Sequence, residues 1–337
     1  MGSVPWSLEQ LGIAAKVWEC EIDPKARALA SARCFTVEHL QPHCVWFWAS
    51  DKGLQRLREL KPRLVVAGFP CQSVSQANAR GQGLQGKSGV FEAVAKIVNF
   101  LQSEDWQTDF LVECTDFSRN HPDFFKMVGV RLGVQPVILE AAHIGACFRK
   151  RAYWASFPIP KLPIVEFDPN SILDAGRKAL GRKLPTIVAS GTQSWNCKQV
   201  VLAADGTRQP LNIGEMEAAM QFGRGYTALK GLTLQDRHRL VGNAFHGGVL
   251  RHLLLAFVMQ QTLRAAQGSD TLPWPFVLKR QSSQGVFSKR VLSLTERALG
   301  STRSNYKARL GFPSWLRRGS GGLGEHCATL VLGFRPA

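Results

Sequence analysis

The chain has 337 residues, 45% of them apolar, which is enough for one large domain or two smaller ones with a packed core. Its formal net charge of +17 favours a polyanionic partner, most simply nucleic acid, over a charge that only keeps the protein in solution. No apolar run reaches the ~20 residues of a membrane span, the first residues lack the pattern of a secretory signal, and the 8 cysteines form no C-x-x-C pair or zinc-like cluster, so we expect neither a metal site nor a disulfide framework.

Strand-like and helix-like segments alternate from the beginning of the chain. Residues 16–23 (KVWECEID) indicate a strand that ends in acidic residues, and Pro24 then opens a predicted helix that runs to residue 35. Residues 63–70 (RLVVAGFP) form a short apolar run ended by glycine and proline, which is typical of a buried parallel strand.

The alternation continues in the middle of the chain. Residues 90–102 carry apolar side chains at the helical period, and residues 109–115 (DFLVECT) indicate another strand. Residues 152–160 (AYWASFPIP) begin as a strand as well. Strands that alternate with helices predict an α/β domain with a mainly parallel sheet.

Changes in this pattern divide the chain into four segments. We expect residues 1–157 to form the first part of the α/β domain, residues 158–210 a small loop-rich insert, and residues 211–265 the return to the domain, which ends in a long amphipathic helix. Residues 266–337 have many Lys and Arg and few acids, and no pattern assigns a structure to this basic tail.

A lone cysteine follows the predicted strand in the sequence GFPCQSVS, residues 68–75. Open α/β sheets bind ligands at the carboxyl ends of their strands, and Pro70 stiffens the approach to the thiol of Cys71. Such a thiol becomes a nucleophile when neighbouring cations lower its pKa. A lone cysteine in an arbitrary protein is more often buried and inert, so Cys71 alone does not identify a site.

Other polar residues occur at comparable positions along the chain. Glu113 ends the apolar run FLVECT, and Glu21 follows the first predicted strand. Arg149 and Arg151 alternate in CFRKRAYW, so both would point to one face of an extended segment. Asp51 precedes a helix-like segment. Each acid has a plainer interpretation as a helix cap, and only their order along the chain is a strong signal.

The series GFPCQSVS, VECT, FRKRAYW and GNAFHGGV resembles the motif series of the DNA cytosine-5 methyltransferases. The resemblance runs from about residue 8 to about residue 258, and residues 184–253 are most similar to the eukaryotic de novo class. It implies a Rossmann-like class I methyltransferase fold, S-adenosyl-L-methionine as the methyl donor and double-stranded DNA as the substrate.

The resemblance also implies roles for four catalytic candidates. Cys71 would add to C6 of a cytosine flipped out of the duplex, which makes C5 nucleophilic toward a methyl group on sulfonium. Glu113 would stabilise the charge that develops at N3. Arg149 and Arg151 would hold O2 and help to lower the pKa of the thiol.

Cofactor-binding residues follow from the same resemblance. Glu21 would bind the ribose hydroxyls, Ile22 would pack on the adenine, and Asp51 would accept a hydrogen bond from the adenine amino group. The residues implied to close the methionine side of the pocket are Asn243, Ala244 and Phe245.

Candidate DNA contacts lie in the polar loop after Cys71 and in the insert, which corresponds to the target-recognition region of the family. The loop candidates are Ser73, Ser75 and Gln76. The insert candidates are Lys183, Ser190, Thr192, Gln193, Ser194 and Lys198. The resemblance further implies a nuclear location, and it allows an oligomer with the same or a related methyltransferase.

Departures from the family pattern leave alternatives open. The family begins with a strand and a turn of the form Phe-x-Gly-x-Gly, whereas MGSVPW stands here, so we expect one central strand and part of the cofactor pocket to be lost. Residues 317–334 (RRGSGGLGEHCATLVLGF) include a strand-like run, but their order argues against a permuted first strand. Cys114 replaces the asparagine of the family's Glu-Asn-Val, which removes an amide that would hold the Pro-Cys loop.

These departures support other interpretations of function. A chain without the first motif could be a catalytically impaired, DNA-binding relative or a regulatory partner, and a truncated gene model would explain the missing motif equally well. An RNA methyltransferase of similar fold is a weaker alternative, because residues 184–253 are so similar to the de novo class.

Overall fold

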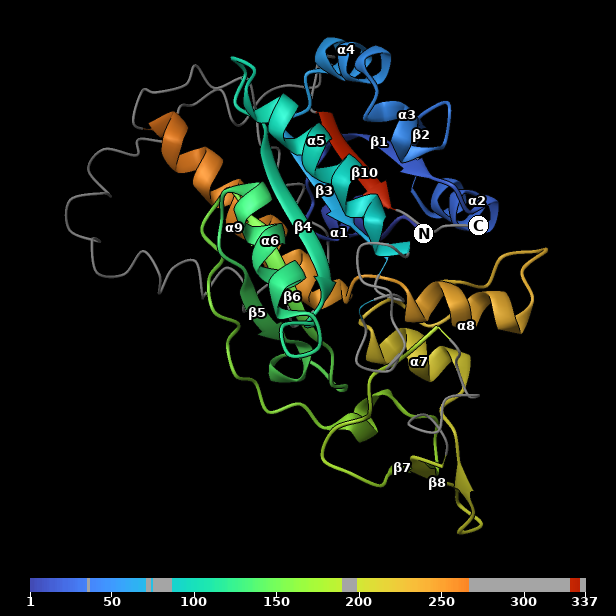
Figure 1. Cartoon of the computed structure of the whole chain (residues 1–337). Coiled ribbons are helices and arrows are strands. Elements are labelled where there is room, and N and C mark those ends of the chain that lie inside the picture. The colour runs from blue at the N-terminus through green and yellow to red at the C-terminus, as the bar shows by residue number, and fades with distance from the viewer. Residues whose placement is uncertain (35–36, 71–73, 75–86, 190–198, 267–327, 334–337) are drawn as a thin grey trace, which may run out of the picture. The chain divides into compact units, whose positions relative to one another are not determined.

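The structure is a computed structural model that describes residues 1–34, 37–70, 74, 87–189, 199–266 and 328–333 (Figure 1). The described residues all belong to one compact unit. The helices are α1 Ser3–Gln10, α2 Pro24–Arg33, α3 Val45–Trp48, α4 Asp51–Leu60, α5 Phe91–Gln102, α6 Pro122–Leu132, α7 Ile213–Ala219, α8 Leu234–Gly242 and α9 Gly247–Ala266. The strands are β1 Lys16–Glu21, β2 Val37–His39, β3 Leu64–Gly68, β4 Asp109–Thr115, β5 Val137–Glu140, β6 Lys150–Ala155, β7 Lys178–Ala179, β8 Val201–Leu202, β9 Arg208–Gln209 and β10 Ala328–Gly333.

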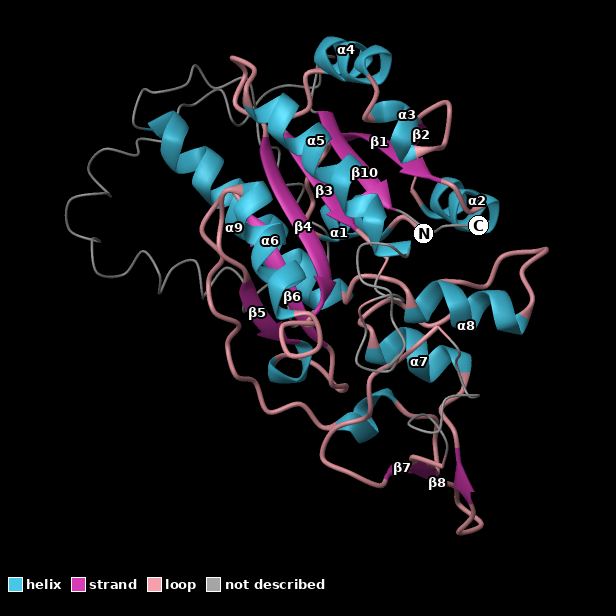
Figure 2. Cartoon of the chain, in the orientation of Figure 1, coloured by secondary structure: helices cyan, strands magenta, loops and turns pink. Residues whose placement is uncertain are grey.

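Among these residues, seven strands form a sheet in the order β2-β1-β10-β3-β4-β6-β5 (Figure 2). The first five strands in this order are parallel, and β6 is antiparallel to both β4 and β5. The strands predicted over 16–23, 63–70 and 109–115 and the helix predicted over 90–102 are all present. The mainly parallel α/β fold that the sequence predicts is therefore confirmed.

The central position between β1 and β3 is occupied by β10, which comes from the end of the sequence. Ala328–Gly333 pairs in parallel with Lys16–Glu21 on one side and with β3 on the other. The expectation that the sheet lacks a central strand is thus wrong, and the order of the sequence did not exclude a permuted strand. The segment ATLVLG consists largely of residues that suit a strand paired at both edges. Sheet pairing depends on this local fit and does not require that neighbouring strands be close in sequence.

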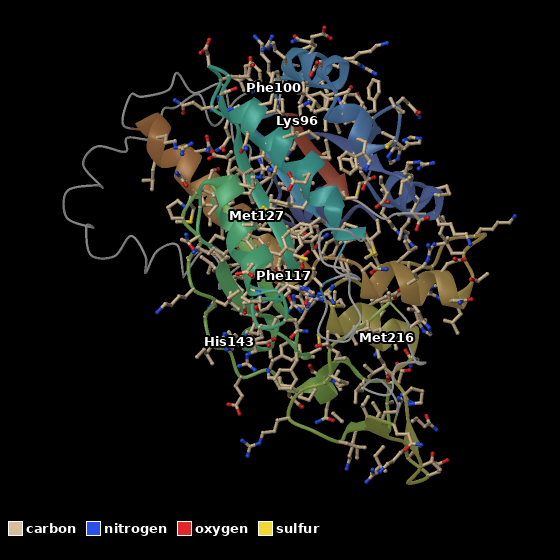
Figure 3. The ribbon with its side chains drawn as sticks, viewed as in Figure 1. Lys96, Phe100, Phe117, Met127, His143 and Met216 are labelled. Carbon is tan, nitrogen blue, oxygen red and sulfur yellow. The ribbon has the colours of Figure 1, made fainter. Side chains whose placement is uncertain are left out.

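Helices cover both faces of this sheet (Figure 1). Successive residues of β3 point to opposite faces, so Val65 packs with α5 and α6 while Val66 packs with α1 and α9. The first face includes a cluster of aromatic rings, in which Phe117, labelled in Figure 3, lies 5.1 Å from Phe124 between ring centroids. With both faces buried, the strands form a rigid support for the residues at their carboxyl ends.

The insert predicted over 158–210 contains the small antiparallel sheet β7-β8-β9. An ion pair connects this insert to α7. Arg177 Nε donates to Glu215 Oε1 at 2.7 Å, and Glu215 has no exposed surface. Glu215 also completes a capping box with Asn212 at the start of α7. The insert is therefore anchored to α7 through the carboxylate of Glu215, which also takes part in the cap of this helix.

Within the described ranges, no helix is both long and apolar enough to cross a membrane.

Candidate active site

A cavity lies at the carboxyl ends of the parallel strands. Glu21 at the end of β1, Gly68 at the end of β3 and Glu113 near the end of β4 contribute to its wall. Arg151 contributes from β6, and residues 242–245 contribute from the end of α8 and the segment that follows it. The carboxyl edge of the sheet thus brings together residues that are far apart in the sequence, at the place where open α/β folds bind ligands.

Glu113 and Arg151 form an ion pair in this cavity, with 3.1 Å between Arg151 Nε and Glu113 Oε1. The antiparallel register of β4 and β6 places Arg151 opposite Thr115, two residues along from Glu113, so the two side chains share a face. Burial raises the pKa of Glu113 above its ordinary value, while Arg151 and Arg149 act in the opposite direction. A carboxyl group with a raised pKa can hold a proton and donate it to a bound base.

Arg149 also lines the cavity, but its guanidinium group mainly binds backbone carbonyls. It donates to Ile187 O at 3.0 Å, to Gly242 O at 3.2 Å and to Ala244 O at 2.6 Å. Burial, followed by the like charge of Arg151, lowers the pKa of Arg149 to about 10. Among the described residues, its Nε has no hydrogen-bond partner. Arg149 therefore holds Ile187 of the insert against Gly242 at the end of α8 and Ala244 beyond it, whereas Arg151 pairs with Glu113.

This difference predicts an effect of Arg149 on stability. We expect Arg149→Met to lower the free energy of unfolding by about 3 kcal/mol, because the three buried carbonyls lose a charged donor. Arg208→Met changes an exposed arginine of β9 and should shift it by no more than about 0.5 kcal/mol. Urea denaturation followed by circular dichroism measures both values. Equal values for the two variants would show that the bonds of Arg149 do not hold the loops.

Two contacts hold Phe69, which lies two residues before Cys71 in the sequence. The ring of Phe69 packs against Phe91 with 5.3 Å between centroids, and its carbonyl accepts a hydrogen bond from Cys114 Sγ at 3.8 Å. Cys114 stands where the family of the resemblance has an asparagine that holds the Pro-Cys loop. Its thiol contacts Phe69, two residues before Cys71 in the sequence. Pro70 lines the cavity. Cys71 itself lies outside the described residues.

The cofactor candidates on β1 lie in the same cavity. Glu21 is 5% exposed and accepts a hydrogen bond from the backbone of Asp23 at 3.0 Å. Glu19, which the sequence analysis missed, lines the cavity as well. Burial alone would raise the pKa of Glu19, but the terminal ammonium group and His39 outweigh it and lower this pKa. Because alternate residues of a strand share a face, the spacing of Glu19 and Glu21 was the signal that could have identified the second acid.

The segment between α8 and α9 closes the opposite side. Asn243, Ala244 and Phe245 all line the cavity, as the resemblance implies. A Cβ atom at Gly68 would lie 3.4 Å from Phe245 Cζ and 3.5 Å from Glu113 Oε2. Phe245 and Glu113 therefore lie on either side of Gly68 at the end of β3, so the two expected halves of the site are continuous.

Two predicted cofactor residues lie elsewhere. The side chain of Asp51 is 99% exposed at the first turn of α4, where it pairs at 3.5 Å with Lys96 of α5, which is labelled in Figure 3. The structure does not bring Asp51 into the cavity. Ile22 is 40% exposed beside Glu21, so its apolar side chain is open to a ligand, but it is not part of the cavity wall.

Among the candidate DNA contacts, only Lys183 belongs to the described residues. Its ammonium group donates to Gly145 O at 2.8 Å and lies 5.9 Å from the centre of the Phe167 ring, so it helps to hold the insert. The other candidates lie outside the described residues: Ser73, Ser75, Gln76, Ser190, Thr192, Gln193, Ser194 and Lys198. The described side chains include no group of His, Cys, Asp and Glu that could hold a metal ion.

No protein-family model matches the sequence. Solved structures are similar to it: the methyltransferase EhMeth of Entamoeba histolytica covers 77% of this chain and 95% of its own, with a TM-score of 0.59 and 13% identity. DNMT2 of Spodoptera frugiperda covers 76% and 96%, with a TM-score of 0.56 and 12% identity. The Dnmt2 methyltransferase of S. pombe covers 77% and 96%, with a TM-score of 0.53 and 14% identity. The chain therefore has the fold of these methyltransferases.

Proposed function

We propose that this chain is a DNA (cytosine-5)-methyltransferase that uses S-adenosyl-L-methionine and the thiol of Cys71. The observation that carries the proposal is the partly buried pair of Glu113 and Arg151 at the carboxyl edge of a methyltransferase fold, in the cavity that Pro70 also lines. A carboxylic acid with a raised pKa beside a guanidinium group can stabilise a nucleobase that gains negative charge on one edge. The order of motifs in the sequence supports cytosine as that base.

The proposed reaction is divided between Cys71 and the residues that line the cavity. The thiolate of Cys71 forms a bond to C6, and the electron pair of the C5–C6 double bond moves toward N3 and O2. Glu113 donates a hydrogen bond or proton at N3, and Arg151 keeps this carboxyl in place. C5 would then bond to the methyl carbon as the bond from that carbon to the sulfonium sulfur breaks, and the sulfur keeps the electron pair and leaves as S-adenosylhomocysteine. Water would take the proton from C5, Glu113 would take back the proton from N3, and the electrons of the C5–H bond would re-form the C5–C6 double bond and expel the thiolate.

The donor set in the cavity fits S-adenosylmethionine in part. This cofactor supplies a methyl group on a positively charged sulfur. Glu21 offers a carboxylate to a vicinal diol, and Phe245 offers an apolar wall beside Gly68. The start of α1 also lies in the cavity wall, where backbone N–H groups favour a carboxylate. Asp51 takes no part in this arrangement.

DNA is the proposed polyanionic substrate, in keeping with the net charge of +17. Cytosine within a stacked duplex is out of reach of such a cavity, so the base must be flipped out. We propose a nuclear site of action because DNA is the proposed substrate. The exposed position of Asp51 favours a second candidate, a DNA-binding relative that holds the cofactor too weakly for efficient transfer.

A transfer assay separates these candidates. The purified chain is incubated with S-adenosylmethionine labelled with tritium in the methyl group and with a cytosine-containing DNA duplex, and labelled 5-methylcytosine is measured after hydrolysis. The proposal predicts label in 5-methylcytosine. DNA binding without transfer would support the second candidate, and transfer to an RNA of the same sequence but not to DNA would contradict the proposed substrate.

A further inference from the structure

The strand β10 is the only described strand that joins β1 to β3. Ala328–Gly333 pairs with the whole length of β1, and its last five residues pair with Leu64–Gly68. Without it, the facing edges of β1 and β3 would each expose a row of unpaired N–H and C=O groups inside a sheet that is covered on both faces. The two parts of the sheet are therefore joined by a segment that is distant from both in sequence.

The same strand separates two groups of cavity residues. Glu19 and Glu21 stand on β1, on one side, while Gly68 on β3 and Glu113 on β4 stand on the other. Gly333, the last residue of β10, is in register with both Glu21 and Gly68. The end of β10 thus lies at the boundary between the proposed cofactor residues and the proposed catalytic residues.

The cores on the two faces continue across this strand. On one face, Val17 of β1 and Val66 of β3 belong to the same buried cluster, and on the other Trp18 and Val65 do. Neighbouring strands in a sheet are about 4.8 Å apart. One strand between β1 and β3 therefore sets the distance at which their side chains pack in the two clusters. Pairing of β10 with both edges therefore fixes the distance between the two groups of cavity residues.

We propose that docking of residues 328–333 between β1 and β3 assembles the cofactor site, so that strand docking and cofactor binding strengthen each other. This inference rests on the proposed function, because it takes S-adenosylmethionine as the ligand of the cavity. The coupling is reciprocal by linkage: a ligand that requires both halves of the cavity binds better when the strand is docked, and the strand is held more firmly when the ligand is bound.

The first test uses the full chain with Leu330→Pro, since proline removes an N–H group from the ladder and does not fit a central strand. Leu330→Ile is the matched control, because it keeps the N–H group and an apolar side chain of similar size. Calorimetric titration measures the affinity of each for S-adenosylhomocysteine, the product form of the cofactor. We expect Leu330→Pro to weaken binding by about tenfold or more and Leu330→Ile to leave it within about twofold. Equal affinities of the two variants would overturn the inference.

A second test keeps the strand sequence intact, in case the proline variant fails to fold. A specific protease site is inserted between Gly319 and Ser320 of the full chain, and the protein is cleaved after folding. The rate at which the C-terminal fragment leaves is measured by size-exclusion chromatography after dilution. S-adenosylhomocysteine should slow this loss by about fivefold or more, and an unchanged rate would contradict the coupling.

The two proposals fail in different ways. If the uncleaved chain with its natural sequence does not bind S-adenosylhomocysteine, the proposed function fails and the coupling falls with it. If that chain binds the ligand while Leu330→Pro binds it equally well, or while fragment loss ignores the ligand, only the coupling is wrong.

Discussion

Replacing Cys71 with serine is expected to reduce methyl transfer to cytosine by on the order of a thousandfold or more. A serine hydroxyl is protonated at neutral pH and is a poor nucleophile, whereas a cysteine thiol is partly ionised when cationic groups lower its pKa. Binding of S-adenosylhomocysteine should remain unchanged, because the cofactor candidates stand on other segments. Initial rates of tritium transfer to duplex DNA measure the first quantity, and calorimetry measures the second.

Cys44→Ser is the matched control for this experiment, since Cys44 is an exposed free cysteine with no part in the cavity wall. We expect its transfer rate to stay within about twofold of that of the unaltered chain. A Cys71→Ser protein that transfers methyl groups as fast as Cys44→Ser would show that another group is the nucleophile.

Glu113→Gln is expected to lower the rate of methyl transfer by about 10²–10⁴-fold and to change its pH dependence. Burial raises the pKa of Glu113, so the carboxyl group keeps its proton at a higher pH than an exposed glutamate does. The proposed role requires this proton, and transfer by the unaltered chain should therefore fall as the pH rises through the pKa of Glu113. Glutamine can donate a hydrogen bond at every pH but cannot give up a proton.

Rate measurements over the whole pH range in which the protein stays folded should thus show a fall toward alkaline pH that is present in the unaltered chain and absent in Glu113→Gln. Glu92→Gln provides the control, because Glu92 lies on α5 and forms an exposed pair with Arg131. The same alkaline fall in Glu113→Gln would assign it to another group and contradict a role for this proton.

Much of the fold was predictable because its signals are local. The continuous apolar run LVVAG, the helical period of FEAVAKIVNFLQ and the proline that begins α2 each depend on a few neighbouring residues. The presence of Glu113 and Arg151 in one site was also predictable, since both belong to recognisable motifs, whereas their ion pair depends on the register of β4 and β6.

Other features depend on contacts between distant segments and leave no local signal. The position of β10 is determined by the two free edges of β1 and β3. Arg149 and Lys183 are of residue types that often bind substrates. Both instead donate to backbone carbonyls that lie near them only in the folded chain. Asp51 stands at the first turn of α4, so a sequence motif for an acid did not distinguish a helix-capping region from a ligand site.

The claim that Cys71 bonds to a pyrimidine ring is tested most directly with a DNA duplex that carries 5-fluorocytosine. Fluorine at C5 cannot leave as a proton does, so the thiol should remain attached to C6 after methyl transfer. Peptide mass spectrometry of the digested complex should find the methylated fluorocytosine adduct on Cys71, and only in the presence of S-adenosylmethionine. An adduct on another cysteine, or methyl transfer to ordinary cytosine with no trapped complex, would contradict this account.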